Sequence, residues 1–220
     1  MILPSQRGSI LTLNGNGEAM SWMKRLCNLV AVSLLMPAVS ALAGGGNVLP
    51  AEARIKGYSL EKAAAATAVY NTGQMSGNPA TPPPPKVPFQ VLVGDCTVGC
   101  GTSLYLPIFV VDDSGGAPAG FPTDIRNQDA DAAFLDQYVL AVFDVTAFVV
   151  QVDGKTTVLD EDYIVGAKTP PLLDGTPAGT NYIVSAAFLT PLTRGAHTVA
   201  LGGLINGQPV IFLTYTVTVK

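Results

Sequence analysis

GAHTVALGGLINGQPVIFLTYTVTVK, residues 195–220, has the pattern of two paired β-strands. From Ile211 to Val219 the odd positions are apolar or aromatic, while positions 214, 216 and 218 are threonine. A period of two with one apolar face is typical of a half-buried antiparallel strand. Asn206-Gly207 is a favoured turn pair, and Pro209 predicts a loop longer than two residues. We therefore expect a closing hairpin that buries the odd positions from Ile211 onward.

Short apolar segments separated by Gly, Pro, Asp and Asn occupy the rest of residues 87–220. The expected strands lie in VPFQVLV (87–93), TSLYLPIFVVDD (102–113), AFVVQV and TTVL (147–152 and 156–159), DYIVG (162–166) and NYIVSAAFL (181–189). Asp153-Gly154 is a further hairpin turn signal. About eight short strands predict a mainly β domain, an antiparallel sandwich of the immunoglobulin-like or jelly-roll-like kind.

Two segments have helical patterns instead. Residues 58–73, YSLEKAAAATAVYNTG, begin with Ser59 as a suitable N-cap and are rich in alanine. Leu60, Ala63, Ala64 and Tyr70 share one face, so this helix should pack against another element. Residues 127–144 predict a short helix inserted between strands. The proline-rich GNPATPPPPK, residues 77–86, should be an extended spacer, which makes 44–86 a helix-and-linker region before the sandwich.

The front of the chain has the features of a secretory signal peptide. Lys24 and Arg25 precede an apolar segment (residues 26–39) and a small-x-small site, Ala41-Leu42-Ala43. We expect residues 23–43 to be removed and the protein to be exported, to the periplasm or the cell exterior. Residues 1–22 are then a start site placed too early or a disordered leader. No transmembrane span is expected after cleavage.

Charge excludes some classes of partner. Residues 44–220 contain nine Lys/Arg against fifteen Asp/Glu, a net charge of about −6. Nucleic acids and anionic membranes are bound by basic patches, so this acidic balance argues against both.

With Cys27 in the signal peptide, Cys96 and Cys100 remain, in GDCTVGCG. An even count in an exported protein favours a disulfide. Residues four apart in a straight strand are too distant for a bridge, so the neighbouring glycines would have to fold this segment tightly. A metal pair or a redox pair fits the CxxxC spacing less well.

Candidate sites are few. His197 is the only histidine and therefore the only imidazole base. Ser114, in DDSGGAP, lacks the motif context of a serine nucleophile, so we interpret His197 as a packing or capping residue. Asp112, Asp113, Asp129 and Asp131 are weak calcium candidates, because calcium prefers clustered oxygen ligands. Asp160, Glu161 and Asp162 form a third acidic cluster. No catalytic residue or other cofactor is predicted.

The segments GYSLEKAAAATAVYNTG…TPPPPKVPFQVL, LYLPIFVVDDS and FLTPLTRGAHTVALGG…FLTYTVTV resemble a group of uncharacterised exported bacterial proteins. In that group a helix bearing GYSLE and a proline-containing link precede an immunoglobulin-like β-sandwich. The resemblance covers nearly all of residues 44–220. It implies an exported β-sandwich and no known activity.

Three functional hypotheses follow. The first is a non-enzymatic exported sandwich that acts as a binding or envelope-associated structural module, with an unknown protein or envelope component as its partner. The second is a periplasmic hydrolase that uses the loop carboxylates, with or without a metal. The third is an assembly subunit that donates or accepts a strand, because the final strand runs to Lys220.

Overall fold

The structure is a computed structural model of the 220-residue chain, and it describes residues 47–76, 84–113, 117–125, 127–168 and 181–220. The predicted leader (1–22) and signal peptide (23–43), most of the proline-rich spacer and Ser114 lie outside the described residues. Within the described part, no helix is long and apolar enough to cross a membrane.

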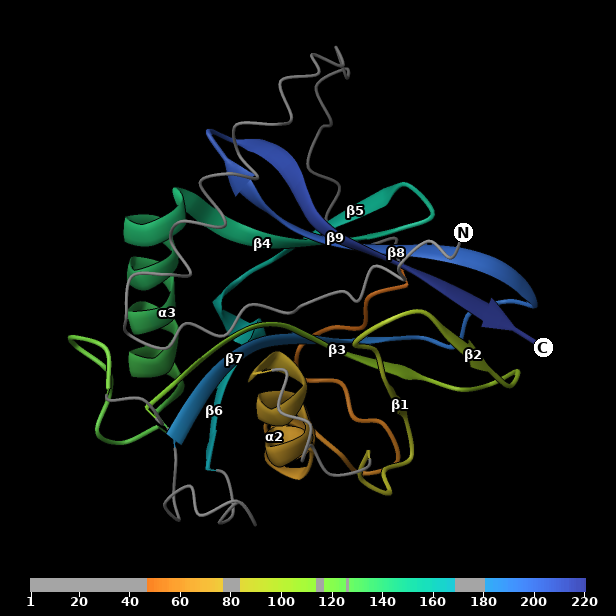
Figure 1. Ribbon diagram of the computed structural model, residues 1–220, viewed down its shortest axis with the longest axis horizontal. Helices are drawn as coiled ribbons and strands as arrows, with labels where there is room; N and C mark the ends of the chain where they lie inside the picture. Colours follow the sequence, from red (N-terminus) through yellow and green to blue (C-terminus); the bar gives the residue numbers. More distant parts are fainter. Residues whose placement is uncertain (1–46, 77–83, 114–116, 126, 169–180) are drawn as a thin grey trace, which may run out of the picture.

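Two sheets form the body of the described structure (Figure 1), which confirms a mainly β fold with a sandwich-like arrangement. One sheet has the order β1-β3-β7-β6 and the other β2-β9-β8-β4-β5. The elements are β1 (Gln90–Val91), β2 (Cys96–Val98), β3 (Leu104–Asp112), β4 (Val145–Val152), β5 (Lys155–Leu159), β6 (Ile164–Lys168), β7 (Asn181–Leu189), β8 (Gly195–Ile205), β9 (Gln208–Val219), α2 (Leu60–Ser76), α3 (Gln128–Phe143) and the 3-10 turn η1 (Glu161–Tyr163).

The sequence predicts an antiparallel sandwich, but two of the strand pairs are parallel. β1 pairs parallel with β3, and β2 pairs parallel with β9. The cause is a crossover, since the chain leaves β1 in one sheet, forms β2 in the other and returns to the first as β3. Strand β2 was not predicted, because three residues next to Asp95 and Gly99 carry no measurable period.

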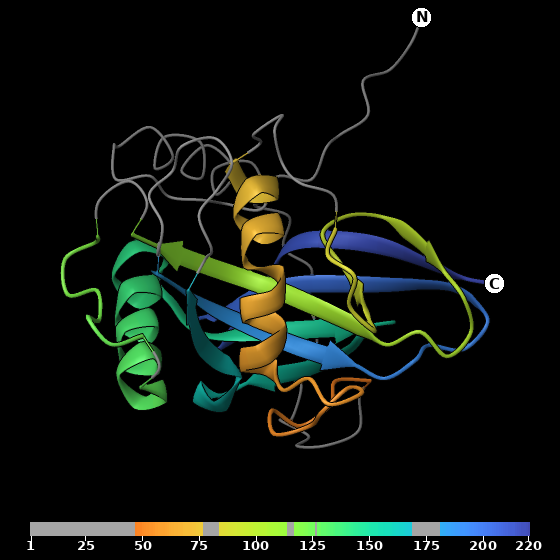
Figure 2. The same cartoon turned by 90° about the horizontal axis from the view of Figure 1, so that it is seen from below.

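Helix α2 packs against β3, β6 and β7 of the four-stranded sheet (Figure 2), as its apolar face predicted. The buried side chains of this face are Leu60, Ala63, Ala64, Thr67, Ala68 and Asn71. Small side chains let the helix backbone approach the sheet closely, and the Tyr182 hydroxyl donates a hydrogen bond to the Ala64 carbonyl. One face of strand β3 meets α2 and the other meets the second sheet. This burial on both faces explains why the sequence of β3 is almost continuously apolar.

Contact between the two sheets includes a stack of Phe109 on β3 and Phe148 on β4, with ring centroids 5.6 Å apart. One hydrophobic core contains buried residues from both sheets and from both helices. The inserted helix α3 confirms the second helical prediction. The side chain of Asn127 caps its N-terminus by accepting from the Ala130 N–H, and Asp144 ends it in the left-handed conformation.

The closing hairpin differs from its prediction in two respects. Ile205 pairs with Gln208, so Asn206-Gly207 is a two-residue turn, and Pro209 lies within β9 opposite Leu204. Both turn residues have positive φ, 52° and 72°, as a type I′ turn requires. The pairing then shifts, because Leu201 faces Leu213 while Gly202 faces Ile211, which leaves Phe212 as the extra residue of a β-bulge.

The bulge changes which residues of β9 are buried. Tyr215, Val217 and Val219 are buried as predicted, whereas Ile211 is 39% exposed. An extra residue interrupts the alternation of faces, so the period of two that begins at Leu213 does not extend back to Ile211.

We predict that Gly166→Ala destabilises the fold. Gly166 lies in β6, where a Cβ atom would overlap the Ile125 carbonyl and the Asp131 carboxylate. Overpacking of this kind costs about 1–3 kcal/mol, so thermal melts should show a lowered midpoint. Gly94→Ala is the matched control, since a Cβ there meets nothing within 4 Å. Equal midpoints for the two variants would contradict the close approach of β6 to α3.

Candidate functional site

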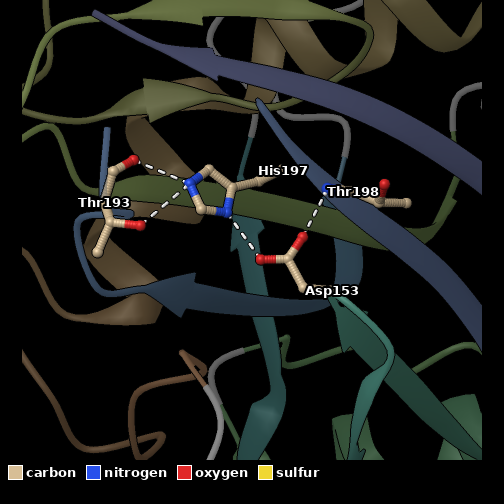
Figure 3. A network of polar contacts seen from close by, with 4 residues as sticks. All are labelled: Asp153, Thr193, His197 and Thr198. Atoms are coloured by element: carbon tan, nitrogen blue, oxygen red, sulfur yellow. Dashed lines mark hydrogen bonds and ion pairs between the residues drawn. The ribbon is translucent and has the colours of Figure 1, made fainter. Parts of the chain in front are cut away.

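His197 is held on both ring nitrogens at the start of β8 (Figure 3). Its Nδ1 lies 2.7 Å from Asp153 Oδ2, and its Nε2 lies 2.8 Å from the Thr193 carbonyl oxygen. Thr193 Oγ1 is a more distant neighbour of Nε2, at 3.4 Å. The imidazole is 11% exposed, whereas the Asp153 carboxylate is 46% exposed.

Both neighbours of the ring are acceptors, so the arrangement fits the doubly protonated imidazolium best. A carboxylate and a carbonyl oxygen each need an N–H to complete the hydrogen bond, and only the cation carries an N–H on both nitrogens. The hydrogen bond to Asp153, followed by the one to the Thr193 carbonyl, raises the pKa of His197 above 6.5. The same contact and the Thr198 N–H lower the pKa of Asp153.

Asp153 joins the β4–β5 turn to β8. It has a left-handed backbone (φ 49°) at the first position of the turn, which aspartate tolerates better than most residues. Its Oδ1 accepts from the Thr198 N–H at 2.9 Å, and its own N–H donates to the Thr198 carbonyl at 2.9 Å. We call Asp153, Thr193, His197 and Thr198 the His197 clamp, since these contacts fasten three segments together.

The His197 clamp does not have the geometry of a general base. An Asp–His pair orients a catalytic imidazole only when the second nitrogen faces a nucleophile or a substrate. Here that nitrogen faces the Thr193 carbonyl. The structure thus supports the interpretation of His197 as a packing or capping residue.

The predicted acidic residues have separate structural surroundings. Asp113 accepts from the Asn181 N–H and side-chain amide, both at 2.8 Å, and fixes the start of β7. Asp160 accepts from the Asp162 N–H at 3.2 Å and caps η1. Asp112 is buried at the end of β3, while Asp129 is exposed in the first turn of α3. Among the described residues, no group of three or more His, Cys, Asp or Glu side chains is placed to hold a metal ion.

Asp131 differs from the other carboxylates because it is fully buried, at 0% exposure, on the side of α3 that meets β6. Neither of its carboxylate oxygens has a hydrogen-bond partner among the described residues. Burial, and then the nearby charge of Asp124, raises the pKa of Asp131 from 3.8 to about 6. Burial therefore shifts the protonation equilibrium of this internal carboxyl group toward its neutral form.

The predicted disulfide is absent from the structure: Cys96 and Cys100 are both free thiols. The sequence interpretation required a tight turn between them. Instead Cys96–Val98 is extended along β9, and the turn follows, with the Thr102 N–H donating to the Gly99 carbonyl at 3.2 Å. The Cys100 thiol contacts the Lys220 carbonyl oxygen at 3.0 Å and so helps to hold the C-terminal residue.

A hollow of about 510 Å³ lies along the outer side of α3, beside residues 119–122. Its lining is mostly small or aromatic, with Phe134 and Tyr138 as the large side chains and Gln137 as the amide. The predicted carboxylates and His197 are not among its lining residues. The lining residues of this hollow therefore include no carboxylate or imidazole, and Tyr138 is their one titratable side chain.

Sequence reasoning missed the partners of His197. Asp153 is 44 residues away, and only the pairing of Val152 with Val199 between β4 and β8 brings the two side chains together. The Asp153-Gly154 turn signal placed the aspartate at a hairpin tip. It gave no information about which strand would lie beside that tip.

We predict that Asp153→Asn lowers the pKa of His197. Asparagine tolerates the left-handed backbone and can still accept from Thr198, but it removes the negative charge beside Nδ1. NMR titration should show the single histidine of the chain titrating above 6.5 in the wild type and closer to 6.5 in the variant. Asp160→Asn, which alters a cap on another loop, is the matched control. An unchanged histidine pKa in Asp153→Asn would contradict the clamp.

The same contacts predict how stability depends on pH. The folded-state pKa of His197 is raised, so its contribution is complete below about 6.5 and is lost as the pH rises through the folded value. The folded-state pKa of Asp153 is lowered, so its contribution is present above about 4 and is lost as the pH falls through the folded value. The clamp should thus contribute most between about pH 4 and 6.5, as urea unfolding of wild type and Asp153→Asn would measure.

We predict that Asp131→Asn stabilises the protein at alkaline pH. Because the folded-state pKa of Asp131 is raised, folding is penalised once the group must ionise, between about pH 4 and 6. The amide never ionises, so the variant should gain about 3 kcal/mol over the wild type at pH 8 and much less at pH 4. Asp129→Asn, at an exposed position of the same turn, should show no such gain. A loss of stability at pH 8 in Asp131→Asn would show that the charge has a partner.

Comparison with known proteins adds little to this geometry. No protein-family model matches the chain, and no curated protein matches it. Among solved structures the chain is similar to the solution structure of amebosin, at 12% identity and a TM-score of 0.25, with 61% of this chain and 100% of that chain covered. A TM-score this low supports no conclusion about fold or function.

Proposed function

We propose that the chain is an exported, non-enzymatic β-sandwich protein that acts as a binding or envelope-associated structural module. The observation that carries this proposal is how the acidic side chains of the loops are used. Asp95, Asp113, Asp153 and Asp160 each accept from a backbone N–H, at four separate places on the sandwich. These hydrogen bonds hold loops and strand ends in place, so the carboxylates have a structural use, as expected for a non-enzymatic module.

The hydrolase hypothesis requires carboxylates that converge with His197 in one cleft. The described contacts of His197 join it to Asp153 and Thr193 alone, and neither belongs to the acidic clusters of the sequence. We therefore favour the structural module over a hydrolase, with or without a metal.

The third hypothesis, an assembly subunit that pairs strands, is favoured by one specific observation. The first half of β9 exposes three consecutive apolar residues, in a stretch that β2 does not pair with. This surface would give the proposed module a way to contact another protein.

Export is tested by expressing the full chain without a tag and measuring the mass of the product in each cell fraction. We expect a product that begins at Gly44 in the periplasm or the medium. Ala43→Lys should block cleavage, because the site requires a small residue. A cytoplasmic product that keeps residues 23–43 would contradict the proposal.

A functional test separates the module from the hydrolase. Mature protein should be cross-linked in its native envelope fraction, and in parallel assayed against a panel of chromogenic esters, peptides and glycosides. We expect a specific cross-linked partner and no turnover. Turnover that is lost in both Asp113→Asn and Asp131→Asn would instead support the hydrolase.

A further inference from the structure

The start of β9 is unusual for a surface strand. Val210, Ile211 and Phe212 are 39%, 39% and 48% exposed, and they are consecutive. Single exposed apolar side chains are common, and a half-buried strand alternates between its two faces. Three in a row leave both faces of the strand apolar and open to solvent.

Within the described part of the chain, no strand pairs with the outer backbone edge of this segment. Strand β9 pairs with β8 along its length, but with β2 only from Val217 to Val219. The Thr216 N–H points to the β2 side, since it donates to Asp95, and the Lys220 N–H donates to Val98 on the same side. By the period of two, the N–H and C=O of Thr214 also point to that side, beyond the reach of the β2 pairing.

Two features bound the stretch of this edge that another strand could pair with, and a third, the bulge, lies within that stretch. Pro209 has no N–H to donate, and the bulge at Phe212 alters the spacing of the ladder. At the other end, the Asp95 carboxylate occupies the Thr216 N–H at 2.7 Å. The segment from Val210 to Thr214 is left, and we call it the open edge.

The charge pattern indicates what can occupy the open edge. Strand β9 has no charged side chain, and β8 has only His197. In a two-fold contact each strand meets its own copy, so any charge on it would face a like charge. Residues 44–220 carry a net charge of about −6, so two copies repel over most of their surface, whereas the open edge presents no charge.

Other exposed apolar side chains lie at the same end of the molecule as the open edge. The β8–β9 turn lies at the end of the sandwich where α3 leads into β4 (Figure 1), and Ile205 pairs with Val145 there. Leu140 and Val142, in the last turns of α3, are exposed at 49% and 39%. More apolar surface is thus available at the same end of the molecule.

From these observations we infer that two copies of this chain associate through the open edge, with their Val210–Thr214 segments paired antiparallel across a two-fold axis. This inference deepens the strand-pairing form of the proposed function and rests on it. The contact is short, so the dimer is weak and depends on concentration. Added salt strengthens it, because salt screens the repulsion between two acidic copies.

The test is analytical ultracentrifugation of the mature protein over a concentration series. We expect a monomer–dimer equilibrium whose dissociation constant rises at least about tenfold in Ile211→Lys, which sets two cations close together at the two-fold axis. Val158→Lys is the matched control, since Val158 is 45% exposed on β5, the opposite edge of the same sheet. Thermal melts and the histidine titration would verify that both variants fold.

A second variant tests the backbone pairing separately. Thr214→Pro removes the outward N–H without adding charge, and it should also weaken the dimer. A strictly monomeric wild type at every concentration would overturn the inference, as would a dimer that Val158→Lys disrupts and Ile211→Lys does not. Neither result bears on export or turnover, so the proposed function would fail or stand by its own tests.

Discussion

The pairing of β8 with both β4 and β9 is the constraint on which the rest of this structure depends. Strand β8 is the central strand of the five-stranded sheet, and its two registers fix its neighbours on either side. The register with β4 places the Asp153 turn beside His197, and the register with β9 creates the bulge at Phe212. A slip of one residue would reverse the faces and bury the threonines of β9 in place of Tyr215 and Val217.

Gly202 shows how closely this pairing is fitted. A Cβ atom at Gly202 would overlap the Val210 carbonyl, so the bulge requires a residue without a side chain on β8. Gly203 next to it lies against the side chain of Val145. The Gly-Gly pair therefore allows β9 and β4 to approach β8 at the same level.

The extent to which sequence predicted this structure follows from the range of the interactions involved. Periodicity is a local property, so the strands, the alanine-rich α2 and the Asn127-capped α3 could all be located. The fold class then follows from the number of strands and their spacing. What could not be predicted depends on register between distant segments. The parallel pairing of β2, the Asp153–His197 contact and the separation of Cys96 from Cys100 are of this kind.

The acidic residues show that the sequence alone also gives little information about a metal site. Asp129 and Asp131 belong to the same acidic cluster of the sequence, yet the Asp129 side chain is exposed and the Asp131 side chain is fully buried. On a helix, two positions i and i+2 point in different directions, so a DAD motif does not supply two ligands to one site. Density of acidic residues along the chain is therefore a weak indication of a metal site unless the element that carries them is known.

The β2–β9 edge of the five-stranded sheet is protected along part of its length. At this edge, β2 and the Asp95 carboxylate cover the second half of β9, and Pro209 and the bulge interrupt the first half. Such features are the usual means by which proteins prevent uncontrolled pairing of edge strands. Pro209 and the Asp95 carboxylate act at the two ends of the open edge, while the bulge at Phe212 lies at its uncharged centre. An edge protected at its ends and apolar between them restricts pairing to one short register, which favours a defined contact over open-ended aggregation.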